Sequence, residues 1–336
     1  MDIQSKKTQS TNSMGHTGHW KKSILPGVMT LAIFGVIFTF VPIKETWETA
    51  RRVSPWTILI VLAISTVFNS LVYSDRWRFA LKHVGLKVGL MEILRVHLAT
   101  GPIRLILPIQ TGELATAAAL ARRSGSSTGM VFGTILYNKY LTLVATLILL
   151  AGGLFAGASM DGSVLRVTVG AGLAALCIFM AFEVRIMRRI FIRAASGTHA
   201  FLGELAKNLL TAYDKIPLAA KFKLVAYSLF FQFSEVVSCC LLFRDFGIDM
   251  PFGQLVVYVQ LFVLITSLPI SIAGAGTREG LALILLAPLS SPETAVACGL
   301  VYSFLEYLWP LVMGFPWTLS LGSKLWRQGN QPNDQA

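Results

Sequence analysis

Charged residues are scarce in this sequence: Asp, Glu, Lys and Arg make up only 14% of its 336 residues. A soluble domain typically carries about 25% charged residues. Hydrophobic residues reach 54%, and the mean hydropathy is +0.64. Several apolar runs attain the roughly 20 residues that cross a hydrocarbon core about 30 Å thick. The sequence therefore predicts a polytopic membrane protein rather than a soluble enzyme.

Motifs for metal, redox or hydrolytic chemistry are also lacking. The four cysteines lie within apolar segments and form no CxxC pair, so they predict neither disulfides nor a metal site. No HExxH, DxD or CDP-alcohol transferase Asp cluster is found. We expect no catalytic residue, no metal and no cofactor.

Acidic residues are scarcer than basic ones, which leaves a net charge of +12. The basic residues stand in short loops beside apolar runs, as in cytoplasmic loops that face anionic lipid, so nucleic acid is not an expected partner. With a cytoplasmic N-terminus, the outer loops keep only Lys44, Arg51, Arg52 and Arg244. We therefore predict both termini inside and a multi-pass protein of the bacterial inner membrane.

Hydropathy divides the chain into spans and tails. We predict six transmembrane helices, over residues 24–42, 56–74, 129–157, 164–183, 222–243 and 294–320. Residues 1–23 and 324–336 are expected to be cytoplasmic tails, the first of them disordered, around a single transmembrane domain at 24–323. Residues 199–216 have apolar side chains at helical spacing, which predicts an amphipathic helix on the cytoplasmic surface or a plain loop helix.

Two further apolar segments, near 90–121 and 254–288, are interrupted by proline and glycine. The interruptions read LPIQTGE from Leu107 and LPISIAGAGTREG from Leu268. A broken helix at membrane depth requires protein or a wet cavity around its freed backbone groups. We therefore predict two re-entrant hairpins, with hinges at Pro108, Gly112, Pro269, Gly274 and Gly276.

The two hairpins have similar surroundings. Pro108 follows Gly85 by 23 residues, and Pro269 follows Gly247 by 22. Each predicted half, about 24–157 and 164–323, contains three membrane crossings. Because three is an odd number, the second half begins on the opposite side of the membrane from the first and is therefore inverted. Inverted repeats with broken helices are typical of alternating-access transporters. The predicted fold is an all-α polytopic membrane protein: six transmembrane helices and two re-entrant broken hairpins in an inverted repeat.

Charged residues inside the predicted membrane domain are candidates for substrate binding, because each costs about 2.5–3.5 kcal/mol on insertion scales. Near Gly276 a helix begins, whose free N–H groups and Arg278 suit a phosphate, while Glu279 suits an amine. Structural ion pairs that lock the hairpins are the alternative role. The candidate substrate-binding residues are Arg104, Glu113, Lys139, Arg278, Glu279 and Glu306.

At these positions the sequence resembles the transmembrane region of the lysylphosphatidylglycerol synthase/flippase family. Residues 269–280, PISIAGAGTREG, are similar to the family's PISIGGLGxREG signature. Arg76-Trp77, with Leu107-Pro108 and Gly112-Glu113 downstream, resembles its RW…LPGxxGGD pattern. The resemblance covers about residues 25–322 and implies translocation of phospholipids with modified head groups, or of related lipid-linked molecules.

The sequence departs from the family pattern at two places. Glu113 stands where the family often has Asp, and Asn138-Lys139 where it often has Glu-Arg. Lysine keeps the positive charge but loses the planar fork of arginine, so the lipid is expected to differ from lysylphosphatidylglycerol. The sequence also contains no soluble aminoacyl-transferring domain, so we expect no synthesis of that lipid.

The function expected from these observations is a lipid flippase that moves a phospholipid or lipid-linked head group between leaflets. An integral-membrane accessory subunit, or an enzyme of lipid or glycolipid modification, is the alternative. The expected partner is a membrane lipid, with a lipid-modifying enzyme or a glycosyltransferase as a further candidate. Gly153 and Gly157 permit close helix packing, within one chain or in an oligomer.

Overall fold

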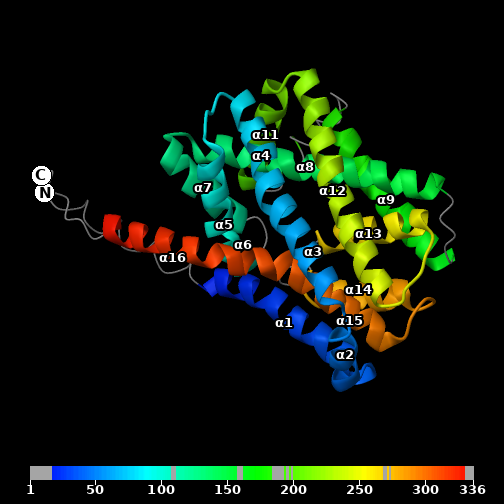
Figure 1. Cartoon of the computed structure of the whole chain (residues 1–336). Helices are drawn as coiled ribbons and strands as arrows, with labels where there is room; N and C mark the ends of the chain where they lie inside the picture. The colour runs from blue at the N-terminus through cyan, green and yellow to red at the C-terminus, as the bar shows by residue number, and fades with distance from the viewer. Residues whose placement is uncertain are drawn as a thin grey trace, which may run out of the picture.

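The computed structural model describes residues 17–106, 111–156, 162–183, 193, 197, 200–267, 271 and 274–329. All regular elements in these residues are helices (Figure 1). Their bounds are α1 Thr17–Phe40, α2 Ile43–Ala50, α3 Pro55–Ser65, η1 Thr66–Val72, α4 Tyr73–His83, α5 Leu90–Ala99, α6 Gly101–Ile106, α7 Thr111–Ser124, α8 Thr128–Phe155, α9 Gly162–Glu183, α11 Ala200–Lys215, α12 Leu218–Asp245, α13 Phe252–Thr266, α14 Thr277–Leu286, α15 Pro292–Ser303, η3 Phe304–Leu308 and α16 Trp309–Gly329.

Four helical stretches of the described chain are long and apolar enough to cross a membrane: Pro55–His83, Thr128–Phe155, Leu218–Asp245 and Pro292–Ser320. They lie at the second, third, fifth and sixth predicted spans. The pair α1 and α2 also passes, with a bend of 94° at Pro42, so up to five spans are present. α9 lies at the fourth predicted span but is not among these candidates. The chain is a multi-pass membrane protein, and the count of six stays a prediction.

Helices at both ends of the chain extend into the predicted tails. α1 begins at Thr17, so residues 17–23 are helical, and α16 extends to Gly329, so residues 324–329 are helical too. Adding a residue to an existing helix costs far less than starting a new one, so an apolar span readily extends into polar sequence.

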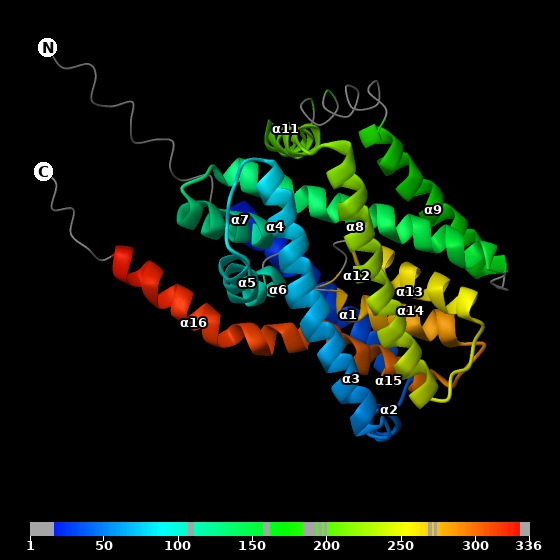
Figure 2. The ribbon, with the colours of Figure 1, turned by 45° about the horizontal axis from the view of Figure 1, so that its top comes forward.

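α11 occupies the position of the predicted amphipathic helix. Its buried residues Leu209 and Leu210, with Ile216 just after its end, pack in one cluster with Tyr137 and Tyr140 of α8. α11 therefore rests on α8 (Figure 2). These buried side chains are covered by protein rather than lying against lipid.

The entering helix of each hairpin packs against the last long helix of the other half. In the first hairpin, α5 packs along α16, and Thr318 Oγ1 donates to Ala99 O at 2.8 Å. In the second, α13 packs along α8, where Gly153 faces Gly253. The close packing predicted for Gly153 is thus found within the chain. This reciprocal contact is what an inverted repeat would produce, although the repeat itself remains a prediction.

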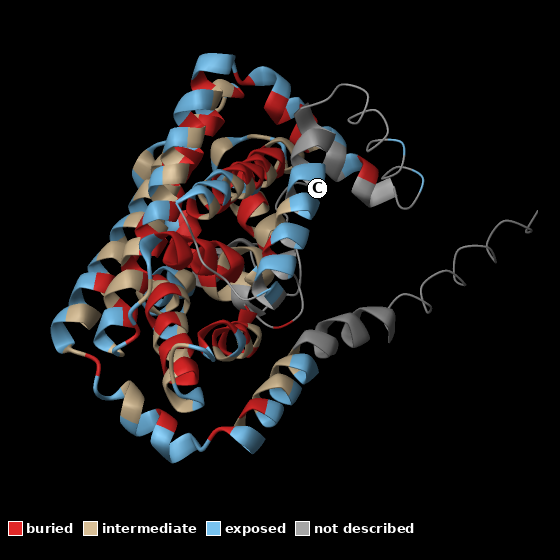
Figure 3. Cartoon of the chain, turned by 90° about the vertical axis from the view of Figure 1, so that its right-hand side faces the viewer, coloured by how far each residue is buried: buried red, intermediate tan, exposed pale blue. Residues whose placement is uncertain are grey.

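The buried residues gather in the interior of the helix assembly (Figure 3). The largest buried apolar cluster draws on α12, α13, α14 and α15. Many large apolar side chains lie on the outside instead, among them Leu31 and Phe40, which are 75% and 78% exposed. Water disfavours such a surface and acyl chains do not, so the exterior agrees with a location in lipid.

Candidate functional site

The first hairpin brings Arg104 of α6 beside the start of α7. A Cβ on Gly112 would lie 2.5 Å from Arg104 Cα, so only glycine allows this approach. Thr116 Oγ1 then donates to Thr100 Oγ1 at 2.9 Å and ties the two arms together. The predicted hinge Pro108 lies outside the described residues.

Glu113 and Lys139 meet at this hairpin. Glu113 is in the first turn of α7, and its Oε1 lies 3.0 Å from Nζ of Lys139 on α8. The lysine side chain is 49% exposed and the glutamate side chain 18%. This ion pair is therefore the accessible part of the candidate site.

A chain of hydrogen bonds links Arg104 to Glu306. Arg104 Nη1 donates to His97 Nδ1 at 3.1 Å, and His97 Nε2 donates to Asn69 O at 3.1 Å. Asn69 Nδ2 then donates to Glu306 Oε2 at 2.8 Å. Two of the predicted charges, from opposite halves of the chain, are thus joined through His97 and Asn69, which sequence reasoning did not identify.

Both ends of the last of these bonds lie in π-helical turns, η1 for Asn69 and η3 for Glu306. Such turns are found frequently at functional sites. Pro310 has no N–H and so cannot donate to the carbonyl of Glu306 four residues earlier. Asn69 Nδ2 reaches that carbonyl instead, at 3.4 Å. The proline thus makes the Glu306 carbonyl available to η1.

The second hairpin holds its charges in a closed arrangement. Gly274 and Gly276 have φ of 77° and 82°, a region that disfavours other residues, and α14 begins at the next position, Thr277. Glu279 Oε2 accepts from Gly276 N at 2.6 Å, and Ser303 Oγ donates to Glu279 Oε1 at 2.5 Å. The chain's own carboxylate therefore occupies the helix N-terminus that we expected to be open to a phosphate. The hinge Pro269 lies outside the described residues.

Arg278 is enclosed by the same cluster. Its Nη1 donates to Ser303 Oγ at 2.7 Å, and its guanidinium carbon lies 3.7 Å from the centre of the Tyr307 ring. Arg278 and Glu279 are each only 1% exposed. Their charges are balanced inside the protein, so this conformation gives a ligand no access to them.

Glu235 of α12 also belongs to this second cluster. Tyr302 OH donates to a carboxylate oxygen of Glu235, and the Tyr302 ring lies 5.9 Å from the guanidinium carbon of Arg278. A carboxylate in the middle of an apolar span was the available signal.

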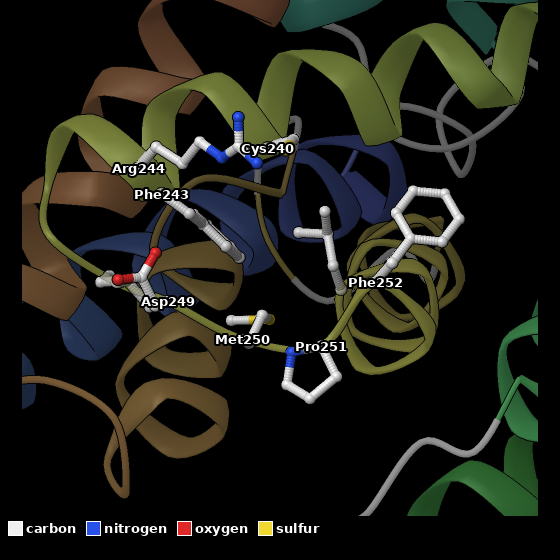
Figure 4. Close-up of a pocket in the computed structure, with 9 residues that line it drawn as sticks. Cys240, Phe243, Arg244, Asp249, Met250, Pro251 and Phe252 are labelled. Carbon is white, nitrogen blue, oxygen red and sulfur yellow. The ribbon is translucent and has the colours of Figure 1, made fainter.

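A separate cavity of about 400 Å³ opens at the turn between α12 and α13. Arg244 and Asp249 stand at its rim, with Phe243, Met250 and Phe252 around it (Figure 4). None of the predicted site residues lines it. Among the described residues, no three or more His, Cys, Asp or Glu side chains are placed to hold a metal ion.

Residues 23–314 match the family model described as the lysylphosphatidylglycerol synthase TM region. The chain belongs to this family. The match spans both hairpins, three of the four long apolar helices and most of the fourth, so the family resemblance predicted from the sequence is confirmed. No curated protein matches the chain. Membership of the lysylphosphatidylglycerol synthase TM region family makes this a membrane protein of lipid modification or flipping.

Proposed function

We propose that the protein moves a phospholipid or lipid-linked head group between the two leaflets. The observation that carries this proposal is the hydrogen-bonded chain from Arg104 to Glu306, which joins the first hairpin to the last long helix. Charges within a membrane domain are costly and usually functional. A hydrogen-bonded chain that joins both halves suits a transport site that is exposed alternately to the two sides of the membrane.

The head group binds at the first hairpin in this conformation. Lys139 and Arg104 offer positive charge to a phosphate, and Glu113 offers negative charge to an amine. A ligand that carries both charges can replace the 3.0 Å Lys139–Glu113 pair with one contact to each partner. The half-exposed Lys139 side chain provides the access.

The second hairpin is the closed counterpart. Arg278 and Glu279 share Ser303 and are buried, while Gly274 and Gly276 supply the backbone freedom to rearrange. One accessible cluster and one closed cluster are what a single state of an alternating-access transporter contains. In the opposite state, Arg278 and Glu279 would be exposed.

Lipid translocation in proteoliposomes tests this proposal. The assay measures how much head-group-labelled phosphatidylglycerol becomes accessible to a membrane-impermeant quencher, with and without an imposed proton gradient. We expect faster exchange than in empty liposomes, and a loss of at least about tenfold in Lys139→Gln and Glu113→Gln, because each removes one head-group contact.

Arg123→Gln is the matched control. Arg123 and Glu92 form a comparable ion pair, with Nε and Oε1 3.0 Å apart, but outside the proposed site. This variant should transport like the wild type. An accessory subunit or a lipid-modifying enzyme would leave exchange at the level of empty liposomes, and that result would refute the proposal.

A further inference from the structure

Arg76 on α4 is a buried cation without a carboxylate. It is 1% exposed, and its Nη1 donates to the hydroxyls of Thr142 at 3.3 Å and Ser228 at 3.0 Å. Its guanidinium carbon lies 5.3 Å from the centre of the Tyr73 ring and 5.4 Å from that of Phe231. None of the ion pairs found in the described part of the chain includes Arg76.

This arrangement departs from the sequence interpretation, in which Arg76 belonged to a cytoplasmic loop. The structure places it in α4, within the continuous helical stretch Pro55–His83, and buries its side chain. Buried charges are normally paired, because an uncompensated one is strongly destabilising. Two neutral hydroxyls and two aromatic rings compensate a full positive charge only in part.

Other buried polar atoms near Arg76 lack partners as well. Arg76 Nε, Ser74 Oγ and both side-chain atoms of Asn138 have no hydrogen-bond partner in the structure. Ser74 and Asn138 are completely buried. More than about 90% of buried polar groups in proteins are hydrogen-bonded, so three such residues together are unusual.

The helix contacts show that these groups share one region. Trp77 Nε1 of α4 donates to Thr134 Oγ1 of α8 at 2.9 Å, and Arg76 bonds Thr142 of the same helix. Asn138 lies one helical turn from each of these two threonines, on the same face of α8. Ser74 lies three residues before Trp77, so it also faces α8. The unsatisfied groups therefore converge between α4 and α8.

The chemistry of this group suits an oxyanion. Arg76 provides a permanent positive charge, and Arg76 Nε, Asn138 Nδ2 and Ser74 Oγ provide hydrogen-bond donors. The amide oxygen of Asn138 remains free to accept from a hydroxyl next to the anion. We propose that Arg76, Asn138 and Ser74 form a binding site for the phosphodiester of a phospholipid head group. As a step of transport, the site rests on the proposed function.

The accessible cluster offers a way to this buried site. Lys139, the neighbour of Asn138 on α8, is half exposed. The Tyr73 ring lies between the two cation sites: its centre is 4.5 Å from that of the His97 ring, and His97 accepts from Arg104. A phosphate first held by Arg104 and Lys139 would pass Tyr73 to reach Arg76.

Ligand-induced stabilisation of the full-length protein in detergent tests the site without any transport step. The probes are dihexanoyl phosphatidylglycerol, dihexanoylglycerol, which lacks the phosphate, and inorganic phosphate. A ligand that binds only the folded protein raises the melting temperature. We expect a rise with phosphatidylglycerol and none with dihexanoylglycerol. Inorganic phosphate separates the two sources of the anion: if it matches the lipid, the site takes free phosphate, and if only the lipid acts, it takes the head group.

Two variants and one control localise the effect. Arg76→Gln and Asn138→Leu should weaken apparent lipid binding by about tenfold or more, because each removes hydrogen bonds to a charged group. Arg78→Gln should leave it unchanged, since Arg78 is a half-exposed neighbour paired with Asp75, with Nη2 and Oδ1 2.6 Å apart. Asn138→Leu also removes two unsatisfied buried atoms, so its melting temperature without ligand should not fall.

The site is refuted if the wild type responds to neither phosphate-bearing probe, or if Asn138→Leu responds as strongly as the wild type. If Arg76→Gln does not fold, Asn138→Leu decides the question alone. A lipid-dependent rise without translocation in liposomes would defeat the proposed function and leave the oxyanion site standing. Translocation without a lipid-dependent rise in melting temperature would support the proposed function and refute the oxyanion site.

Discussion

Replacing Glu279 with alanine should destabilise the protein far more than replacing Glu113. Glu279 is 1% exposed and accepts two hydrogen bonds, from Gly276 N at 2.6 Å and from Ser303 Oγ at 2.5 Å. Its loss would leave the start of α14 uncapped and would remove the carboxylate that is linked to Arg278 through Ser303. Breaking a buried charged pair on one side costs about 3–5 kcal/mol.

Glu113 stands in a different setting. Its partner Lys139 is 49% exposed, so water can solvate the lysine when the carboxylate is removed. Ion pairs that are open to solvent contribute about 0.2–1 kcal/mol. At about 2–4 °C per kcal/mol, the expected fall in melting temperature is roughly 6–20 °C for Glu279→Ala and no more than roughly 4 °C for Glu113→Ala.

The measurement is the melting temperature of the detergent-solubilised protein, followed by the loss of its monodisperse peak in size-exclusion chromatography. A double variant, Arg278→Met with Glu279→Met, serves as the control, because removing both buried charges is often neutral or stabilising. It should be more stable than Glu279→Ala. Equal losses in Glu279→Ala and Glu113→Ala, or a double variant no better than the single, would show that burial does not separate the two clusters.

Two further predictions follow from single contacts and a third from the predicted topology. Gly153→Val should prevent folding, because even a Cβ at this position would lie 2.8 Å from the backbone oxygen of Gly253. The control is Gly152→Ala, which should not change the yield of folded protein, because a Cβ there would have nothing within 4 Å. Glu306→Gln keeps an acceptor for Asn69 but removes a buried charge. We therefore expect a melting temperature at or above that of the wild type, together with lost translocation. Retained translocation would show that the charge is dispensable. A cysteine at the exposed Asp249, in a background without native cysteines, should react with an impermeant thiol reagent from outside the cell, and labelling only after permeabilisation would overturn the predicted topology.

Much of the candidate site was visible in the sequence as charge in apolar surroundings. Glu113 and Lys139 form a pair, and Arg104 and Glu306 are joined by a hydrogen-bonded chain. The links in that chain, His97 and Asn69, could not be predicted. Asn69 and Glu306 lie 237 positions apart, and no local pattern encodes which polar groups meet over such a separation.

Two roles also depended on burial rather than on residue type. The sequence left Glu279 open to an amine contact or to a structural ion pair; in this conformation it caps its own helix, because the turn at Gly276 points that backbone N–H toward the carboxylate. Arg76 was counted as a loop residue because it follows an apolar run. Its burial comes from Thr142 and Ser228 on two other helices, which the sequence around Arg76 does not reveal.

The sequence by itself determined the membrane class, the family motifs, the positions of the long apolar helices and the break before α14. These features follow from local quantities: the transfer free energy of an apolar run, and the backbone restrictions of proline and glycine. Only the tertiary structure decided that α11 covers α8, that Gly153 meets Gly253, and which charges stay accessible. Those outcomes depend on which surfaces of distant helices fit together. Many pairings satisfy the same local pattern, and packing of the whole chain selects among them.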